Sequence, residues 1–144
     1  MPESYVIDTD VVSYLFRGDT RAEHYRALLG ESVRVVSFVT LAEVNYWAVS
    51  RGWGSTRRRE LDDYLDQFVV VFSDGDLCEI WARVVHQARR NGRPILPSDA
   101  WIAATAISLN VPLITNNLSD YAGVTELQLA HVPVVSDEDT GHHE

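Results

Sequence analysis

Short apolar runs alternate with segments of helical periodicity along the chain. Four runs rich in β-branched residues have the length of strands, at residues 5–7, 33–38, 68–72 and 111–115. A fifth run, residues 132–135, contains Pro133, which favours the edge of a sheet. Between the first four runs, apolar residues recur every three or four positions, as on one face of a helix. This alternation predicts an α/β domain with a central parallel sheet of four or five strands.

Local signals set the expected limits of the helices. We place their starts at residues of the types that cap helices, or that form a capping box with a Glu three positions later. One further helix is expected over residues 55–67, and the uninterrupted apolar run 68–72 predicts a strand covered on both faces. The helix over residues 99–109 is apolar on nearly all sides, which predicts that it is buried. The expected N-terminal signals are Asp10, Thr20 with Glu23, Thr40 with Glu43, Asp76 with Glu79, and Ser98.

Length and composition describe one soluble domain. The chain has 144 residues, of which 46% are hydrophobic and 23% are charged, within the range of globular proteins. We predict a domain over residues 1–135 followed by an acidic, disordered tail over residues 136–144. Its single cysteine, Cys78, excludes an intrachain disulfide and a Cys-rich zinc site. With no signal peptide and no apolar run of membrane-spanning length, we expect a cytoplasmic protein with no membrane partner.

The net charge of −9 argues at first against a nucleic-acid partner, since such partners usually meet a basic surface. Four acids of the tail account for four of these charges: Asp137, Glu138, Asp139 and Glu144. Several other acids fall where a bound cation would neutralise them. The charge is therefore weak evidence against RNA, and it favours a basic protein partner.

Polar residues follow the predicted strands at positions that a parallel sheet would bring together. Asp8 follows the first strand, Asn117 follows the fourth, and Glu43 and Asp99 lie in the first turns of predicted helices. The carboxyl ends of parallel strands and the starts of the next helices share one edge of the sheet, where ligands bind. Converging carboxylates repel one another unless a cation lies between them, and Mg²⁺ and Mn²⁺ prefer such oxygen ligands. Carboxylate-held Mg²⁺ in turn favours phosphoryl chemistry.

Each of these residues also has a structural explanation. Glu43 fits a capping box, Asp99 is favoured by the dipole at a helix start, and Asp10 fits an N-cap. Asn117 fits a turn. Asp8 is different, because a charge at the end of an apolar strand needs partners. The residues alone leave both explanations open, and they do not separate RNA from DNA as a substrate.

Four segments resemble, in this order and spacing, the motifs of PIN-domain ribonucleases, and in particular the VapC-type toxins of type II toxin–antitoxin systems. These segments are residues 6–10, 40–44, 93–104 and 113–121. The resemblance implies a three-layer α/β/α PIN-like fold in which Asp8, Glu43 and Asp99 hold Mg²⁺ or Mn²⁺. Asn117 falls where many members have a fourth acid, and nearby Asp120 is an alternative for that place. The resemblance also implies that Thr9 and Thr115 support the site through hydroxyl hydrogen bonds.

The activity that the resemblance implies is endonucleolytic hydrolysis of RNA by metal-activated water, with a transfer RNA, ribosomal RNA or messenger RNA as substrate. It further implies a cognate antitoxin that inserts an Arg among the carboxylates, a homodimer, and a toxin–antitoxin hetero-oligomer. Two alternatives stay open. One is a catalytically silent PIN-like module that binds protein or RNA, against which the retention of all three acids argues. The other is a metal-dependent DNA 5′-nuclease or phosphatase.

Overall fold

A five-stranded, wholly parallel sheet organises the chain. The computed structural model describes residues 2–131. The strands lie in the order β3-β2-β1-β4-β5, so the first strand is central and the chain extends the sheet first to one side and then to the other. The bounds are β1 Ser4–Ile7, β2 Val33–Ser37, β3 Val69–Val71, β4 Leu113–Ile114 and β5 Leu129–Ala130.

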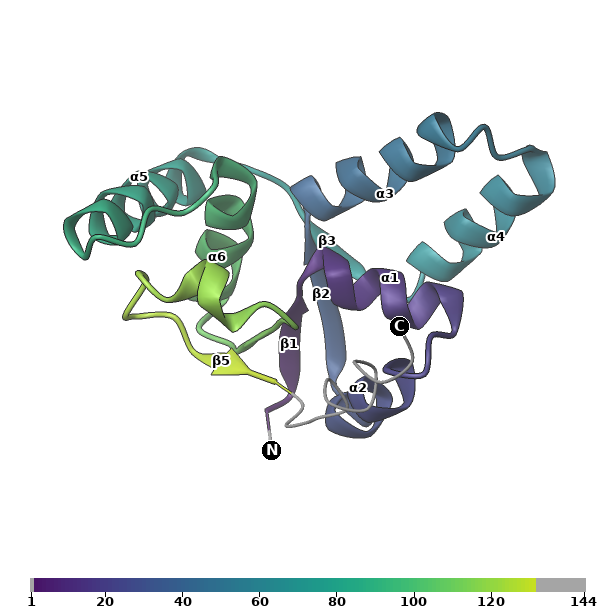
Figure 1. The fold of residues 1–144 in the computed structure, drawn as a ribbon, viewed down its shortest axis with the longest axis horizontal. Helices are drawn as coiled ribbons and strands as arrows, with labels where there is room; N and C mark the ends of the chain where they lie inside the picture. Colours follow the sequence, from purple (N-terminus) through teal and green to yellow (C-terminus); the bar gives the residue numbers. More distant parts are fainter. Residues whose placement is uncertain (1, 132–144) are drawn as a thin grey trace, which may run out of the picture.

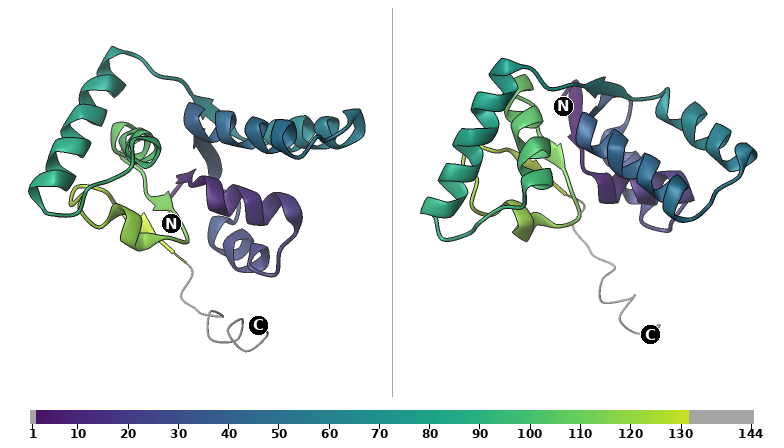
Figure 2. Two further views of the ribbon diagram at one scale, coloured as in Figure 1. Left: turned by 45° about the horizontal axis from the view of Figure 1, so that its top comes forward. Right: turned by 90° about the horizontal axis from the view of Figure 1, so that it is seen from above.

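Helices cover both faces of this sheet. The first four lie on one side of the sheet and the next two on the other (Figures 1 and 2). The predicted three-layer α/β/α fold is therefore confirmed. On the first side are α1 Thr9–Arg17, α2 Ala22–Leu29, α3 Phe38–Ser50 and α4 Ser55–Leu65; on the second are α5 Gly75–Arg90 and α6 Pro97–Leu109, and a short 3₁₀ helix, η1 Leu118–Tyr121, follows β4.

Alternation along the strands divides the core into two halves. Tyr5 and Ile7 of β1 pack with the apolar residues of α1 to α4, while Val6 between them packs with those of α5 and α6. Successive strand residues point to opposite faces, and both faces are covered here, so β1 is apolar at all three positions. The prediction of a buried helix over residues 99–109 is also confirmed, since α6 lies between the sheet and α5 and buries Ile102 almost completely.

Four of the six predicted helix starts were wrong by two or three residues. The residue at the end of a strand caps the next helix directly: Asp8 caps α1, and Ser37 caps α3 by accepting from the backbone N–H of Val39 at 3.1 Å. Asp10 and Thr40 are consequently inside these helices rather than at their caps. Strand and helix follow each other here without a loop. The capping residue is therefore the last residue of the strand or the one directly after it.

The start predicted at Ser55 is confirmed, since α4 begins there. The remaining predicted starts fail for similar local reasons. α5 is capped by Asp74, whose carboxylate accepts from the N–H of Leu77 at 2.8 Å, so Asp76 and Glu79 form no capping box. α6 begins at Pro97, which has no N–H to satisfy in a first turn, so Ser98 is not the cap. α2 follows an N-cap, Arg21, that makes no side-chain capping bond, and Thr20 therefore opens no capping box with Glu23.

The edges of the sheet also differ from expectation. β3 was predicted to be covered on both faces, but it is an edge strand, with Val69 about half exposed (52%). Its apolar residues pair with β2 on one side only. The opposite edge is β5, which the hydrophobic pattern did not predict. The strand predicted over residues 132–135 and the tail over residues 136–144 lie outside the described residues.

No helix within residues 2–131 is long and apolar enough to cross a membrane.

Candidate active site

The predicted site residues lie where the chain changes direction across the sheet. The connections from β1 to β2 and from β2 to β3 pass over one face, and the connection from β3 to β4 passes over the other. The chain leaves β1 into α1 on the first side of the sheet, and it leaves the neighbouring β4 into η1, which contacts α6 on the second side. This is a point at which parallel sheets bind ligands, and Asp8, after β1, and Thr115, after β4, both lie there.

Asp8 is the most deeply buried carboxylate of the site. It is 7% exposed and accepts three hydrogen bonds: from the N–H of Thr9 at 2.7 Å, from the hydroxyl of Thr115 at 2.7 Å and from the hydroxyl of Tyr121 at 2.9 Å. Burial is the main reason that the pKa of Asp8 is raised, and the negative charge of Glu43 adds to the shift. The three donors hold the ionised form in place against this desolvation.

Thr9 connects Asp8 with Glu43. While its N–H binds Asp8, its hydroxyl donates to Glu43 Oε1 at 2.6 Å and lies 2.9 Å from the hydroxyl of Thr40. Glu43 is half-buried on α3 and does not close a capping box, because the helix starts five residues earlier, at Phe38. The structure thus decides against the capping explanation of Glu43 and brings it into the same cluster as Asp8.

Asp99 approaches the cluster from the other side of the sheet. It lies in the first turn of α6, and its Oδ1 is 3.5 Å from the hydroxyl of Tyr121. Partial burial, followed by the charge of Asp8, raises the pKa of Asp99 from its ordinary value of 3.8 to about 6. The favourable helix dipole at this position does not offset these effects. Ionising Asp99 in this position costs free energy. A cation bound by its carboxylate explains the placement of Asp99 better than stabilisation of the helix does.

Asn117 is held by Asp10. Its side-chain amide N–H donates to Asp10 Oδ2 at 3.0 Å, and its backbone N–H donates to the hydroxyl of Thr115 at 3.0 Å. The backbone N–H of Asn116 also reaches Asp10 Oδ2, at 3.2 Å. Asp10 was interpreted only as a cap, but its carboxylate fixes the loop after β4. Burial and the charge of Asp8 raise its pKa to about 7.

Asp120 stands at the margin of the site. Its side chain is exposed, yet it is close enough for its charge to contribute to the raised pKa of both Asp10 and Asp99. The side-chain N–H of Asn117 is engaged by Asp10, so it is the amide oxygen that remains for a ligand. Whether Asn117 or Asp120 completes the site stays a prediction.

Tyr121 is the site residue that the sequence reasoning missed. Its ring is 1% exposed, and its hydroxyl lies between Asp8 and Asp99. Burial and these two carboxylates raise the pKa of Tyr121 far above its ordinary value, so the hydroxyl keeps its proton. Tyr121 lies in the segment 113–121 that resembles the last PIN-domain motif. Its position in that segment does not indicate that its hydroxyl bonds to Asp8.

The donor chemistry of the cluster suits a hard divalent cation. It offers carboxylate oxygens from three different elements and an amide oxygen, which are ligands that Mg²⁺ and Mn²⁺ prefer. Within residues 2–131, no three His, Cys, Asp or Glu side chains already lie close enough together to hold a metal ion. Hydrogen-bond donors lie between the acids instead. Thr9 joins Asp8 to Glu43 through its backbone N–H and its hydroxyl, and the hydroxyl of Tyr121 joins Asp8 to Asp99.

Comparison with known proteins agrees with this geometry. The family model described as PIN domain matches residues 5–121, a span that contains every acid of this site. The chain belongs to the PIN domain family. This PIN domain is 30% identical over 126 residues to Ribonuclease VapC1 from Haemophilus influenzae (strain R2866), an alignment that covers 86% of this chain and 94% of that protein.

Solved structures extend the likeness of this PIN domain to its whole fold. VapBC2 from Rickettsia felis, solved bound to a DNA fragment from its promoter, superposes with a TM-score of 0.77 at 21% identity, over 89% of this chain and 98% of that one. VapBC-5 from Mycobacterium tuberculosis, a member of the VapBC family of toxin–antitoxin systems, gives a TM-score of 0.69 at 25% identity, over 92% and 100% of the two chains. The relatives of the PIN domain thus include a named ribonuclease and a toxin–antitoxin protein.

Proposed function

We propose that this PIN domain is an Mg²⁺- or Mn²⁺-dependent endoribonuclease and the toxin of a toxin–antitoxin pair. The observation that carries the proposal is the linkage of Asp8 to Glu43 through the backbone N–H and hydroxyl of Thr9, and to Asp99 through the hydroxyl of Tyr121. Support for ribonuclease activity comes from the 30% identity to Ribonuclease VapC1. A cation bound among these acids would explain why the chain keeps several buried or half-buried carboxylates close together.

Asp8, Glu43 and Asp99 would hold the metal, and the oxygen of Asn117 is available as a fourth donor. When bound, such a cation activates water as a nucleophile and neutralises charge on phosphoryl oxygens. In-line attack of water on phosphorus would form a new P–O bond and break the bond to O3′, leaving a 5′-phosphate and a 3′-hydroxyl. Thr9 and Thr115 fix the orientation of the Asp8 carboxylate, because each donates to a different oxygen of it.

An antitoxin partner follows from the same excess of negative charge. Desolvation and mutual repulsion raise the pKa of Asp8, Asp10 and Asp99, so a cationic side chain placed beside these acids would be strongly favoured. We propose that the antitoxin inserts an Arg there and so blocks metal and RNA together. The assembly of VapBC-5, a toxin–antitoxin protein of the same fold, supports such a partner. We place this pair in the cytoplasm, where RNA substrates are available.

A cleavage assay with matched variants tests the proposal. Purified protein is incubated with total cellular RNA in Mg²⁺ or Mn²⁺, with and without EDTA, beside the variant Asp8→Asn and the control Asp62→Asn on the exposed side of α4. We expect discrete cleavage by the wild type and the control, and none with EDTA or with Asp8→Asn. Cleavage that survives in EDTA would refute the metal-dependent mechanism.

The same assay separates the alternatives. Single-stranded and duplex DNA are incubated in parallel, and cleavage of DNA in preference to RNA would favour a DNA 5′-nuclease. RNA binding without cleavage of any RNA would favour the silent module. Co-purification with a small protein encoded beside the gene, together with loss of cleavage in that complex, would support the antitoxin.

A further inference from the structure

Tyr121 makes a contact that the proposed reaction does not account for. Its hydroxyl donates to Asp8 Oδ2 at 2.9 Å and lies 3.5 Å from Asp99 Oδ1, so one proton stands between two of the three predicted ligands. The ring is almost completely buried, against the apolar residues that support α6 and β4. Packing alone would be satisfied by phenylalanine, so the hydroxyl needs a separate explanation.

The hydrogen-bond acceptor positions of the Asp8 carboxylate explain why the Tyr121 hydroxyl is there. An ionised carboxylate has about four such positions, two on each oxygen. In the described part of the chain, Oδ2 receives the hydroxyl of Thr115 and that of Tyr121, which fills it, while Oδ1 receives the N–H of Thr9. One position therefore remains, and it is on Oδ1. Without the Tyr121 hydroxyl, Oδ2 would also have a position free.

We propose that Tyr121 is a positioning residue that occupies Oδ2 of Asp8, so that this carboxylate offers a cation a single oxygen, Oδ1, in a fixed orientation. The proposal rests on the metal site proposed above. By reaching toward Asp99 as well, the same hydroxyl fixes the separation between an acid that follows β1 and one that begins α6. Tyr121 acts through these two carboxylates and needs no contact with RNA.

Thr115 should share this role, which gives the proposal a second, independent variant. Its side chain is fully buried, and its hydroxyl bonds to the same Oδ2 at 2.7 Å. Thr115→Val removes the hydroxyl at nearly constant volume, whereas Thr115→Ser keeps it. Loss in the first and recovery in the second would show that the Thr115 hydroxyl, which also accepts from the N–H of Asn117, is required rather than the packing of the residue. Loss in Tyr121→Phe as well would assign the effect to Oδ2 of Asp8, the atom that both hydroxyls bind.

The test measures Mn²⁺ binding without RNA, by electron paramagnetic resonance of free Mn²⁺, for the wild type, Tyr121→Phe, Thr115→Val and Thr115→Ser. Groups that orient metal ligands usually contribute about 10- to 100-fold to metal affinity or activity. We expect the Kd for Mn²⁺ to rise about 10-fold in Tyr121→Phe and in Thr115→Val, and to stay within about twofold of wild type in Thr115→Ser. The matched control is Tyr64→Phe, a tyrosine in the other half of the core.

Kinetics supply a readout that a loss of packing would not produce. In Tyr121→Phe, kcat for RNA cleavage at saturating Mn²⁺ should fall about 10-fold, with KM for RNA unchanged, since RNA does not touch the hydroxyl. Equal Mn²⁺ affinity and equal kcat in wild type and Tyr121→Phe would overturn this role while leaving the ribonuclease proposal intact. Absence of Mn²⁺ binding by the wild type would overturn the metal site and this role together.

Discussion

Replacing Asp99 by asparagine should make the metal-free protein more stable at neutral pH. The carboxyl has a pKa of about 6 in the folded protein against 3.8 ordinarily, so folding is opposed whenever it must ionise. A shift of about two pKa units corresponds to about 3 kcal/mol, at 1.36 kcal/mol a unit. Because Asp99 is only half-buried, solvent screens much of this, and we expect a gain of about 1 kcal/mol.

The sign of the pH dependence follows from the same shift. Since the folded protein binds this proton more tightly than the unfolded chain, the wild type loses stability as the pH rises from about 4 to about 6. Asp99→Asn should therefore be more stable than wild type at pH 7, and the difference should shrink toward pH 4. Substitution of a residue needed only for helix stability would give the opposite result at pH 7.

Urea unfolding followed by circular dichroism, in EDTA at pH 7 and pH 4, measures the effect. Asp62→Asn, on the exposed side of α4, is the control, and we expect it to lie within about 0.5 kcal/mol of wild type at both pH values. Asp99→Asn should meanwhile lose RNA cleavage. If Asp99→Asn is less stable than wild type at pH 7, or if its gain in stability persists at pH 4, then repulsion and desolvation of the Asp99 carboxylate do not destabilise the folded protein.

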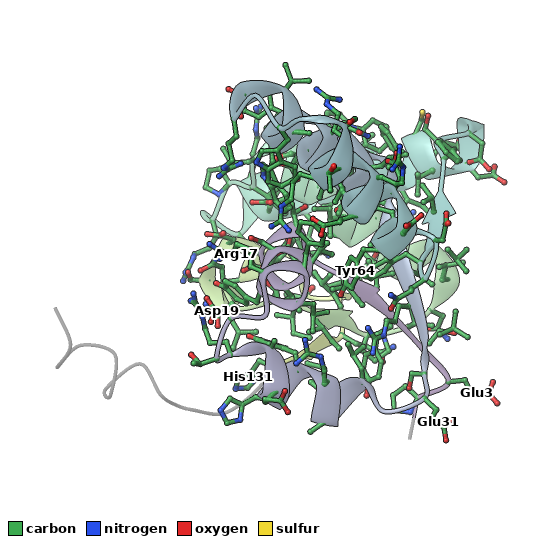
Figure 3. All side chains as sticks on the ribbon, turned by 90° about the vertical axis from the view of Figure 1, so that its right-hand side faces the viewer. Glu3, Arg17, Asp19, Glu31, Tyr64 and His131 are labelled. Carbon is green, nitrogen blue, oxygen red and sulfur yellow. The ribbon has the colours of Figure 1, made fainter. Side chains whose placement is uncertain are left out.

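Three further results are expected. Asp8→Ala should be about 1 kcal/mol less stable than Asp8→Asn in urea unfolding, because asparagine can still cap α1; equal stability would show that the cap contributes nothing. Asp19 bonds Arg21 through two oxygens and has its pKa lowered to about 2, and its place beside Arg17 is visible in Figure 3. Asp19→Asn should therefore cost up to about 1 kcal/mol at pH 7, and this cost should fall steadily below about pH 4 and be largely lost at about pH 2, measured by thermal unfolding across that range. Tyr46 and Val49 are more than 60% exposed one turn apart on α3, so sedimentation should detect the predicted homodimer, and Tyr46→Glu should weaken it; a monomer at all concentrations would contradict the prediction.

The layers and the meeting of the acids could be predicted from the sequence because both depend on periodicity and chain order. Strands at residues 5–7, 33–38 and 111–115 are apolar enough to identify, and parallel connection then brings Asp8, Glu43 and Asp99 to one edge. The starts of the helices could not be predicted as well, since Ser37 and Asp8 serve two elements at once. β5 is only two residues long and carries no periodic signal.

The hydroxyl contacts show where sequence reasoning stops. Thr9 and Thr115 were expected to support the site, and both are confirmed as donors to acids. Tyr121 was not expected, because its ring has to cross from the end of η1 to Asp8, a distance that only the packing of η1 against α6 determines. Asp10 was interpreted only as a cap, because nothing in the sequence indicates that Asn116 and Asn117 donate hydrogen bonds to its carboxylate.

The double role of Asp8 bears on how this fold changes during evolution. As N-cap of α1, Asp8 contributes to folding whether or not the protein cuts RNA. A lineage that lost catalysis would be free to replace Glu43 or Asp99, and at Asp99 it would even gain stability, yet it would keep Asp or Asn at position 8. An acid retained at the end of β1 is therefore poor evidence that a descendant is active, whereas an acid retained at Asp99 is good evidence.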